Sequence, residues 1–294
     1  MTAAISVTGL RKAYGSHEAV RGIDFEVPVG EVFGLLGPNG AGKTTTVEIL
    51  EGYRRADAGE VRVLGIDPNT AGRDWRARIG VVLQSSAVYP GLTVRETLRL
   101  FAGYYPYPRD VEEVIELVGL AEKADGRVRT LSGGQKRRLD LGLALVGDPE
   151  LVFLDEPTTG FDPAARRLAW EMIRSLRRLG KTVLLTTHYL DEAEQLADRV
   201  AVLREGRIVS IGTPAELTGG ARETEIHYRQ DGEAVVIRTA EPTRVLAELT
   251  GAAVTAGVEL EGLSVRRPTL EEVYLALVSD DPAEAESGTP EDTA

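Results

Sequence analysis

Cysteine is absent from the 294 residues, and only 5% of them are aromatic. The lack of thiols excludes disulfides and thiolate metal sites, and no apolar stretch of the secretory type follows Met1. No run reaches the roughly 18 consecutive apolar residues of a membrane-spanning helix. The most apolar runs, residues 151–154 and 182–185, are only as long as strands. These absences predict a cytoplasmic protein that reaches a membrane only through a partner.

Basic residues are outnumbered, with 34 Lys and Arg against 46 Asp and Glu and a formal net charge of -12. Nucleic-acid binding without sequence preference depends on neutralising phosphates with Lys and Arg. The acidic balance therefore disfavours direct nucleic-acid binding, although the basic run at residues 136–138 leaves a local patch. With 43% hydrophobic residues, the chain can form one large core and a small second domain.

Short β patterns separated by turns occur at residues 5–8, 24–27 and 59–66, and they predict an antiparallel sheet. Between them, the apolar run 32–36 leads through a glycine loop into a helix pattern at 43–50. Strand, glycine loop and helix therefore follow one another.

Helical patterns dominate the middle of the chain. One helical block is expected from Thr93 to about residue 124, because Thr93 and Glu96 fit a capping box. A second helix is expected at 136–146. Apolar strands at 151–154 and 183–186 are separated by a helix at 163–179, the order of elements in a parallel sheet. The sequence therefore predicts an α/β fold.

The composition changes after a hinge at residues 212–221. Beyond it, strand and helix patterns predict a small α+β unit: strands at 225–228, 234–238 and 262–266, and helices at 243–249 and 270–278. Residues 279–294 contain Asp, Glu, Pro, Ser and Thr with few large apolar side chains, which predicts disorder.

The loop at residues 37–44 matches the phosphate-binding P-loop pattern in full. Its glycines let backbone amides surround phosphates, and the following helix start adds partial positive charge. Lys43 is expected to contact the β- and γ-phosphates, and Thr44 to ligate Mg²⁺. The predicted nucleotide-binding residues of this loop are Gly37, Pro38, Asn39, Gly40, Ala41, Gly42, Lys43, Thr44 and Thr45.

Two carboxylates, Asp155 and Glu156, follow the apolar strand 151–154 directly. This puts them at the carboxyl edge of the predicted sheet, where ligands bind. Asp155 is then expected to hold Mg²⁺, and Glu156 to polarise the attacking water. Acidic residues at a strand end are also common in ordinary solvated turns.

Upstream of these carboxylates, residues 131–135 read Leu-Ser-Gly-Gly-Gln, and with the P-loop this segment resembles the signature sequence of the ABC ATPase family. A serine hydroxyl and glycine amides at a helix start can bind a γ-phosphate. The resemblance implies that Ser132, Gly133, Gly134 and Gln135 face the nucleotide of a partner, so that two ATP molecules lie between two head-to-tail subunits.

Four further positions match the family one at a time. Tyr14 corresponds to the aromatic residue that stacks on adenine, and Gln84 to the glutamine that joins Mg²⁺ and the lytic water to the coupling region. His188 matches the histidine that contacts the γ-phosphate. Asp162 ends a loop that communicates between the two sites, in which Phe161 replaces the commoner leucine.

The resemblance also implies a fold and a division of the chain. The expected fold is a P-loop NTPase of the ABC ATPase type, with a RecA-like core, an antiparallel β subdomain and a helical subdomain. Residues 1–220 would form the ATPase domain, with the helical subdomain at about 85–130. A small α+β domain at 221–278 and an acidic tail at 279–294 would follow.

In transporters of this family the helical subdomain forms a groove for a cytoplasmic helix of a separate membrane subunit. The side chains expected to line it are Tyr89, Pro90, Leu92, Phe101, Tyr104 and Tyr105, with the subdomain core as the alternative for most of them. Residues 268–277 are similar to the end of ATPase subunits from bacterial exporters of the daunorubicin-resistance type. The alternative is an amphipathic helix that closes the small domain.

The sequence thus predicts a magnesium-dependent ATPase subunit, dimeric with ATP, at the cytoplasmic face of a membrane. It would power export of a drug, an antibiotic or another hydrophobic compound. The alternatives are an importer ATPase or a non-transport ABC ATPase that acts on nucleic acid or the ribosome. A kinase or GTPase is disfavoured by the signature segment and by the lack of an Asn-Lys-x-Asp sequence.

Overall fold

The computed structural model describes residues 3–82, 89–218, 224–230 and 233–266. The chain divides into two compact units, Met1–Ile211 and Gly212–Ala294. Within the described part of the chain, every helix is too short or too polar to cross a lipid bilayer.

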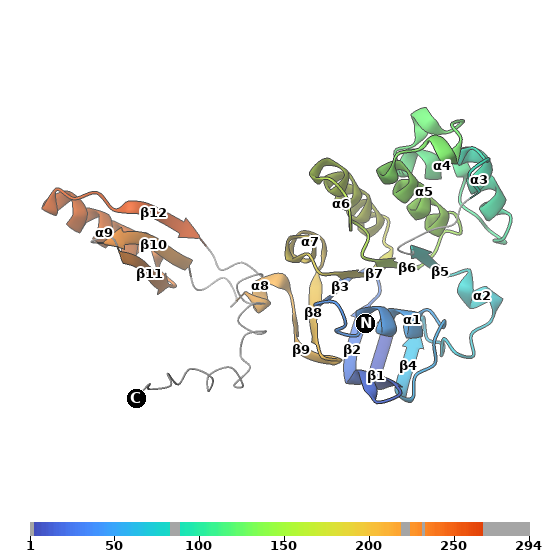
Figure 1. The fold of residues 1–294 in the computed structure, drawn as a ribbon, viewed down its shortest axis with the longest axis horizontal. Helices are drawn as coiled ribbons and strands as arrows, with labels where there is room; N and C mark the ends of the chain where they lie inside the picture. The colour runs from blue at the N-terminus through green and yellow to red at the C-terminus, as the bar shows by residue number, and fades with distance from the viewer. Residues whose placement is uncertain (1–2, 83–88, 219–223, 231–232, 267–294) are drawn as a thin grey trace, which may run out of the picture. The chain divides into compact units, whose positions relative to one another are not determined.

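A six-stranded sheet forms the centre of the first unit, with the strand order β5-β6-β7-β3-β8-β9 (Figure 1). Its strands are β3 (Val32–Leu36), β5 (Ile79–Val82), β6 (Leu151–Asp155), β7 (Thr182–Thr187), β8 (Arg199–Arg204) and β9 (Arg207–Gly212). The pairs from β5 to β8 are parallel, and every residue of β3 and β7 is buried. Strands covered on both faces consist mostly of apolar and β-branched residues, which is the pattern that predicted them. The predicted parallel sheet is confirmed.

An antiparallel sheet with the order β2-β1-β4 comes from the start of the chain. Its strands are β1 (Ala3–Tyr14), β2 (His17–Pro28) and β4 (Ala58–Val63). The antiparallel arrangement is confirmed, but β1 and β2 are longer than the sequence predicted. Their ends carry charged residues, and Lys12 pairs with Asp57 at 2.7 Å beside the sheet. Cross-strand pairing therefore extends the strands past their apolar centres.

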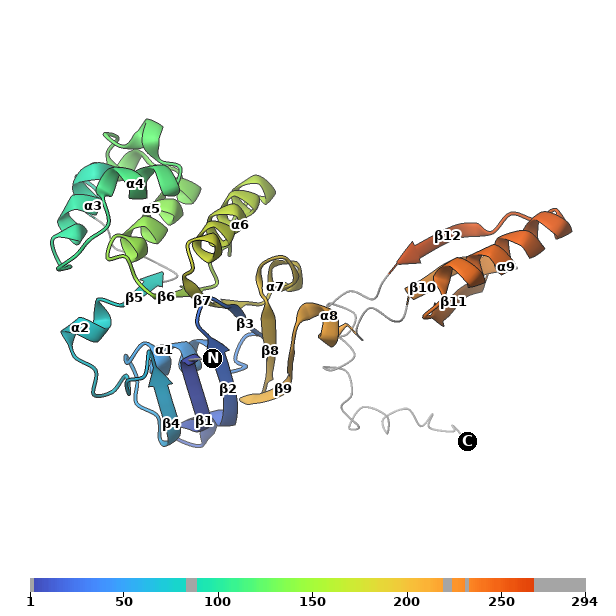
Figure 2. The same ribbon diagram turned by 180° about the vertical axis from the view of Figure 1, so that it is seen from behind.

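Two apolar layers cover the parallel sheet. On one face, α1 (Lys43–Leu50) and the antiparallel sheet pack on it, with the rings of Phe25 and Phe33 stacked at 5.4 Å. Helices cover the other face: α5 (Gly133–Leu145), α6 (Pro163–Arg178) and α7 (Leu190–Leu196). Figures 1 and 2 show the two layers on opposite sides of the sheet. The short helix α2 (Arg73–Arg76) precedes β5.

The helical block predicted from Thr93 to about residue 124 is confirmed, and it is divided into separate helices. The structure has α3 (Val94–Ala102), α4 (Val111–Leu117) and two 3₁₀ turns, Ala121–Lys123 and Val128–Thr130. Pro106 and Pro108 lie between the two helices, and proline cannot donate the backbone hydrogen bond of a helix interior. The capping box at Thr93 is confirmed, since its hydroxyl accepts from Glu96 N at 3.1 Å and Glu96 accepts from Thr93 N at 2.8 Å.

The second unit contains a three-stranded antiparallel sheet with the order β11-β10-β12. The elements described in this unit are α8 (Pro214–Leu217), β10 (Thr224–Gln230), β11 (Glu233–Thr239), α9 (Pro242–Ala256) and β12 (Glu261–Arg266). Helix α9 continues well past the predicted end at residue 249 and stops at Gly257, which has a φ of 66°. The helix expected at 270–278 and the tail at 279–294 lie outside the described residues.

Candidate nucleotide-binding site

The P-loop connects β3 to α1, and two of its glycines are required by close contacts. A Cβ on Gly37 would lie 2.5 Å from Leu203 O, and one on Gly42 would lie 2.4 Å from Ala19 O. Gly42 also has a φ of 103°, which L side chains rarely adopt. The loop can therefore take this path only with glycine at both positions.

Lys43, the first residue of α1, has a side chain that is only 5% exposed. Its Nζ donates to Gly37 O at 2.7 Å and to Pro38 O at 3.2 Å, and lies 3.7 Å from Glu156 Oε1. Burial lowers the pKa of Lys43, and the charges of Glu156 and Asp155 oppose this. A buried ammonium beside an open pocket suits an anionic ligand, because phosphate oxygens would replace the water that it has lost.

Asp155 and Glu156 stand at the carboxyl end of β6, as the sequence indicated. Thr186 of the neighbouring β7 donates its hydroxyl to Asp155 Oδ1 at 2.5 Å. Burial raises the pKa of Asp155, and this hydrogen bond opposes the rise. Glu156 has a φ of 46°, an uncommon value for a residue other than glycine, and its N donates to Thr186 O at 3.2 Å.

His188 follows β7 directly, and its Nδ1 lies 3.3 Å from Glu156 Oε1. Separate roles were expected for these two residues, and the sheet brings them together. Glu156 thus lies between a lysine and a histidine, at the edge where β3, β6 and β7 end.

A pocket of 460 Å³ lies over the P-loop. Its lining residues are Tyr14, His17, Ala19, Asn39, Gly40, Gly42, Lys43, Thr44, Thr45 and Glu156. Tyr14 comes from the end of β1, so the fold brings it to the P-loop. Of the other predicted loop residues, Gly37 and Pro38 face Lys43 with their carbonyls, and Ala41 packs into the core. The sequence did not indicate His17, nor Arg54, whose guanidinium lies 5.4 Å from the centre of the Tyr14 ring.

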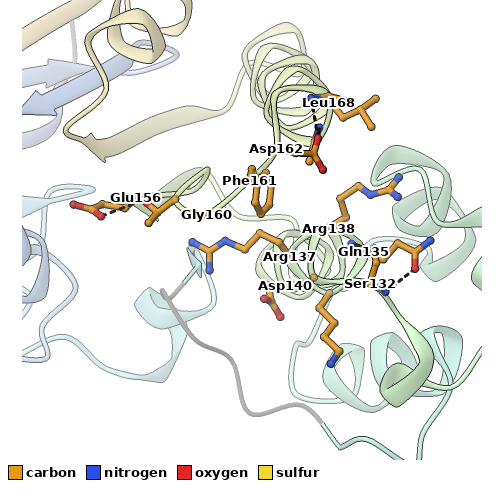
Figure 3. Close-up of a pocket in the computed structure, with 16 residues that line it drawn as sticks. Ser132, Gln135, Arg137, Arg138, Asp140, Glu156, Gly160, Phe161, Asp162 and Leu168 are labelled. Carbon is orange, nitrogen blue, oxygen red and sulfur yellow. Dashed lines mark hydrogen bonds between the residues drawn. The ribbon is translucent and has the colours of Figure 1, made fainter.

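A second, larger pocket of 940 Å³ contains the signature segment (Figure 3). Its lining residues are Ser132, Gly133, Gly134, Gln135, Lys136, Arg137, Arg138, Asp140, Glu156, Thr159, Gly160, Phe161, Asp162, Ala164, Ala165 and Leu168. Glu156 therefore lines both pockets. Figure 3 shows Phe161 and Arg137 between Glu156 and the Ser132 end of the pocket.

Ser132 is the N-cap of α5 and forms a capping box with Gln135. The Ser132 hydroxyl accepts from Gln135 N at 3.3 Å, and Gln135 Oε1 accepts from Ser132 N at 2.9 Å. The helix consequently begins at Gly133, earlier than the residue 136 predicted. An ideal Cβ on Gly133 would meet nothing within 4 Å, and one on Gly134 only Ala165 Cβ at 3.7 Å. Packing within the chain therefore does not require glycine at either position.

Asp162 is the N-cap of α6, and its carboxylate accepts from the backbone N of Ala164 and Ala165 at 2.9 and 2.8 Å. Asp162 ends the loop that begins at Glu156, and Arg137 of α5 contacts the beginning of this loop. Arg137 donates to Asp155 O at 3.1 Å and to Pro157 O at 3.3 Å. Burial lowers the pKa of Arg137. The loop from Glu156 to Asp162 is thus fixed at both ends.

Ser132 and Lys43 line different pockets, so one chain does not bring the two segments predicted to bind phosphate to one place. Gln84 lies outside the described residues. Thr186 was missed in the sequence, because its contact with Asp155 depends on the β6-β7 register, which no local motif reveals.

Comparison with known proteins gives two family matches. The family described as "ABC transporter" matches residues 20–159, and the family described as "ABC transporter domain-containing protein-like, C-terminal domain" matches residues 201–269. Among curated relatives, Nod factor export ATP-binding protein I of Rhizobium meliloti (strain 1021) is 42% identical over 94% of this chain and 88% of its own length. Daunorubicin resistance ATP-binding protein DrrA3 of Streptomyces coeruleorubidus is 42% identical over 95% of this chain and 96% of its own length.

Solved structures with a similar fold include an ATP-binding cassette in a dimeric post-hydrolysis state with ADP and Pi. It is 25% identical, with a TM-score of 0.63, over 71% of this chain and 98% of that chain. An ATP-binding subunit of an ABC transporter has a TM-score of 0.70 over 94% of this chain and 100% of that chain, at 23% identity. The second likeness concerns the fold alone.

Proposed function

The chain belongs to the ATP-binding subunits of ABC transporters, which hydrolyse ATP, and we propose that two copies bind two ATP molecules head to tail. Each ATP would lie between the P-loop of one copy and Ser132 to Gln135 of the other. The observation that carries this proposal is the open space around Gly133 and Gly134. Glycines that the chain itself does not need are explained by a ligand that approaches the backbone from outside.

Within each site, the residues of the first pocket would hold the nucleotide. Tyr14 stacks on the adenine, and the P-loop amides with Lys43 bind the β- and γ-phosphates. Glu156 accepts the proton of the attacking water. His188, whose Nδ1 lies 3.3 Å from Glu156 Oε1, contacts the γ-phosphate.

Magnesium is the cofactor that we propose for this site. Thr44 and Asp155 would hold it with phosphate oxygens and water, and Gln84 would join them. Among the described residues, no group of three or more Asp, Glu or His could hold a metal alone. This fits Mg²⁺, which usually takes one or two protein oxygens and keeps water and phosphate ligands. Bound there, the ion neutralises charge that develops on the phosphates.

We propose export as the direction of transport, through a separate membrane subunit at the cytoplasmic face of the membrane. The relatives named for Nod factor export and daunorubicin resistance align over nearly the whole chain and support this direction. The cargo would be a drug, an antibiotic or another hydrophobic compound. The proposed domains are residues 1–220 for ATP hydrolysis, 221–278 for the accessory domain and 279–294 for the tail.

The surface proposed for the membrane subunit lies on the helical group around α3. Tyr89, Pro90 and Leu92 line an apolar hollow of 380 Å³ with Gly91 and Leu100. Tyr89 is 61% exposed and Tyr104 is 59% exposed. Phe101 and Tyr105 instead pack against the core of the first unit. The proposed contact therefore uses Tyr89, Pro90, Leu92 and Tyr104.

The variant Glu156→Gln tests the proposed reaction. It keeps the shape of the side chain and removes its basicity, so ATP binding should persist while turnover falls at least about 100-fold. Trapped ATP should also hold two copies together, which light scattering would detect. The control is Glu150→Gln, an exposed carboxylate just before β6, which should retain turnover within about twofold. Normal hydrolysis by Glu156→Gln would overturn the role given to Glu156.

A further inference from the structure

One carboxylate of the first unit is fully buried and lines neither of the two pockets described above. Glu192 of α7 is 0% exposed. Its Oε1 accepts from Thr158 Oγ1 at 2.9 Å and from Trp170 Nε1 at 3.3 Å. Burial raises the pKa of Glu192, and its hydrogen-bond donors and the charge of Arg166 oppose that rise. A buried carboxyl group is costly unless its partners satisfy it, so this arrangement calls for an explanation.

The contacts of Glu192 join three segments of the chain. Thr158 lies two residues after Glu156, Glu192 lies four residues after His188, and Trp170 belongs to α6. A single oxygen atom therefore connects the loop with Glu156, the segment with His188, and a helix that packs beside both.

The loop with Glu156 needs such support. Glu156 has a φ of 46°, and a residue other than glycine holds this strained conformation only when its surroundings fix it. Thr186 O fixes the residue itself, and Arg137 fixes the carbonyls on either side of it. The bond from Thr158 to Glu192 fixes the next turn of the loop.

The segment with His188 is fixed to the same helix at a second point. Arg166 lies one helical turn before Trp170 on α6, and its guanidinium is 4.3 Å from the centre of the Tyr189 ring. Arg166 also donates to Asp191 Oδ2 at 3.2 Å. The Tyr189 ring in turn lies 4.1 Å from the His188 ring, centre to centre. Helix α6 thus contacts the His188 segment through Arg166 and Trp170, and farther along α7 through Arg174, which donates to Gln195 Oε1 at 3.1 Å. Of these contacts, Glu192 accepts the one from Trp170.

We propose that Glu192 is a positioning residue for ATP hydrolysis, whose carboxylate keeps Glu156 and His188 at their working separation by tying both segments to α6. The inference rests on the roles proposed above for Glu156 and His188. Because Glu192 touches neither pocket, it acts on the rate of the reaction and not on the binding of ATP. A small displacement of a reacting group is enough to slow a reaction strongly.

The experiment compares Glu192→Ala and Glu192→Gln with the wild type in steady-state ATP hydrolysis. Glu192→Ala should lower kcat at least about 10-fold and leave KM for ATP within about threefold. Glu192→Gln keeps an oxygen that accepts from Thr158 and Trp170, so it should restore kcat to within about threefold of the wild type. The matched control is Glu194→Ala, which removes an exposed glutamate from the same helix and should leave kcat and KM unchanged.

A purely structural role of Glu192 would give a different result. Glu192→Ala would then unfold at a lower temperature, while the kcat of the folded protein stayed at the wild-type value. That outcome overturns the inference, as does a Glu192→Gln variant no faster than Glu192→Ala.

A second variant covers the case in which Glu192→Ala does not fold. Thr158→Val removes only the hydroxyl that donates to Glu192, and it should lower kcat with little change in KM. An unchanged kcat in this variant would also overturn the inference. Glu156→Gln, measured beside these variants, separates the two proposals. If it hydrolyses ATP normally, the proposed reaction fails. If it is inactive while Glu192→Ala and Thr158→Val are fully active, only the role of Glu192 fails.

Discussion

The P-loop and the signature segment are both glycine-rich turns at the start of a helix, but their glycines have different surroundings. Gly42 is pressed against Ala19 O and has a positive φ. A Cβ on Gly134 would make only an ordinary contact with Ala165, at 3.7 Å, and Gly134 is not among the glycines with a positive φ. The first segment needs glycine in order to fold, whereas the second has no such need within its own chain. The same residue type therefore has a structural cause in the first segment, whereas for the second we propose a functional one.

The largest expected effect on the free energy of unfolding comes from Gly42→Ala. The new Cβ would force Ala19 or the loop to move, and the positive φ alone costs about 1–2 kcal/mol for a side chain. We expect a loss of at least about 2 kcal/mol in urea unfolding, together with loss of ATP binding. Gly40→Ala is the control, because Gly40 has a φ of 81° but nothing within 4 Å of an ideal Cβ. If both variants lose equal stability, the contact with Ala19 is unimportant.

An intermediate effect comes from Glu51, which follows α1. Burial, with the charges of Asp155 and Glu48, raises its pKa from 4.5 to about 8. The folded protein then binds this proton more tightly than the unfolded chain. The resulting stability is fully present below pH 4.5 and is lost as the pH rises through about 8.

Glu51→Gln should remove this pH dependence. Between pH 5 and 9, without nucleotide or magnesium, the wild type should lose at least about 1.4 kcal/mol more stability than the variant, the equivalent of one pKa unit. Chemical denaturation at several pH values measures it, with the exposed Glu116→Gln as control. Parallel pH curves for the wild type and Glu51→Gln would contradict the prediction.

The smallest effect on stability is expected for Gly134→Ala. The open space accepts a Cβ, and alanine favours a helix over glycine by about 0.5–1 kcal/mol, so stability should stay constant or rise slightly. Turnover should nevertheless fall at least about 10-fold, because the methyl group occupies space proposed for the phosphate of the partner's ATP. Nucleotide binding to the P-loop should be unaffected. A variant with full turnover would remove the functional explanation for this glycine.

Local patterns predicted the central strands well, because strands buried on both faces consist mostly of apolar and β-branched residues. They were less accurate at the ends of helices. Helix α9 continues through Gly251, although the pattern suggested an end at residue 249. The start of α5 was also missed, even though Ser132 and Gln135 form a capping box that the sequence spells out.

The two segments proposed to bind phosphate, and the carboxylates after β6, could be identified from local residue patterns alone, because phosphate chemistry requires fixed residue types at fixed spacing. The side chains that support them are set by the packing of strands and helices. Thr186 meets Asp155 because β6 and β7 pair in that register, and Glu192 meets Thr158 because α7 packs over the loop between β6 and α6. These contacts join segments about thirty residues apart in the chain, as the gaps of 31 and 34 positions show. No local pattern encodes them, since they depend on how strands and helices pack in space.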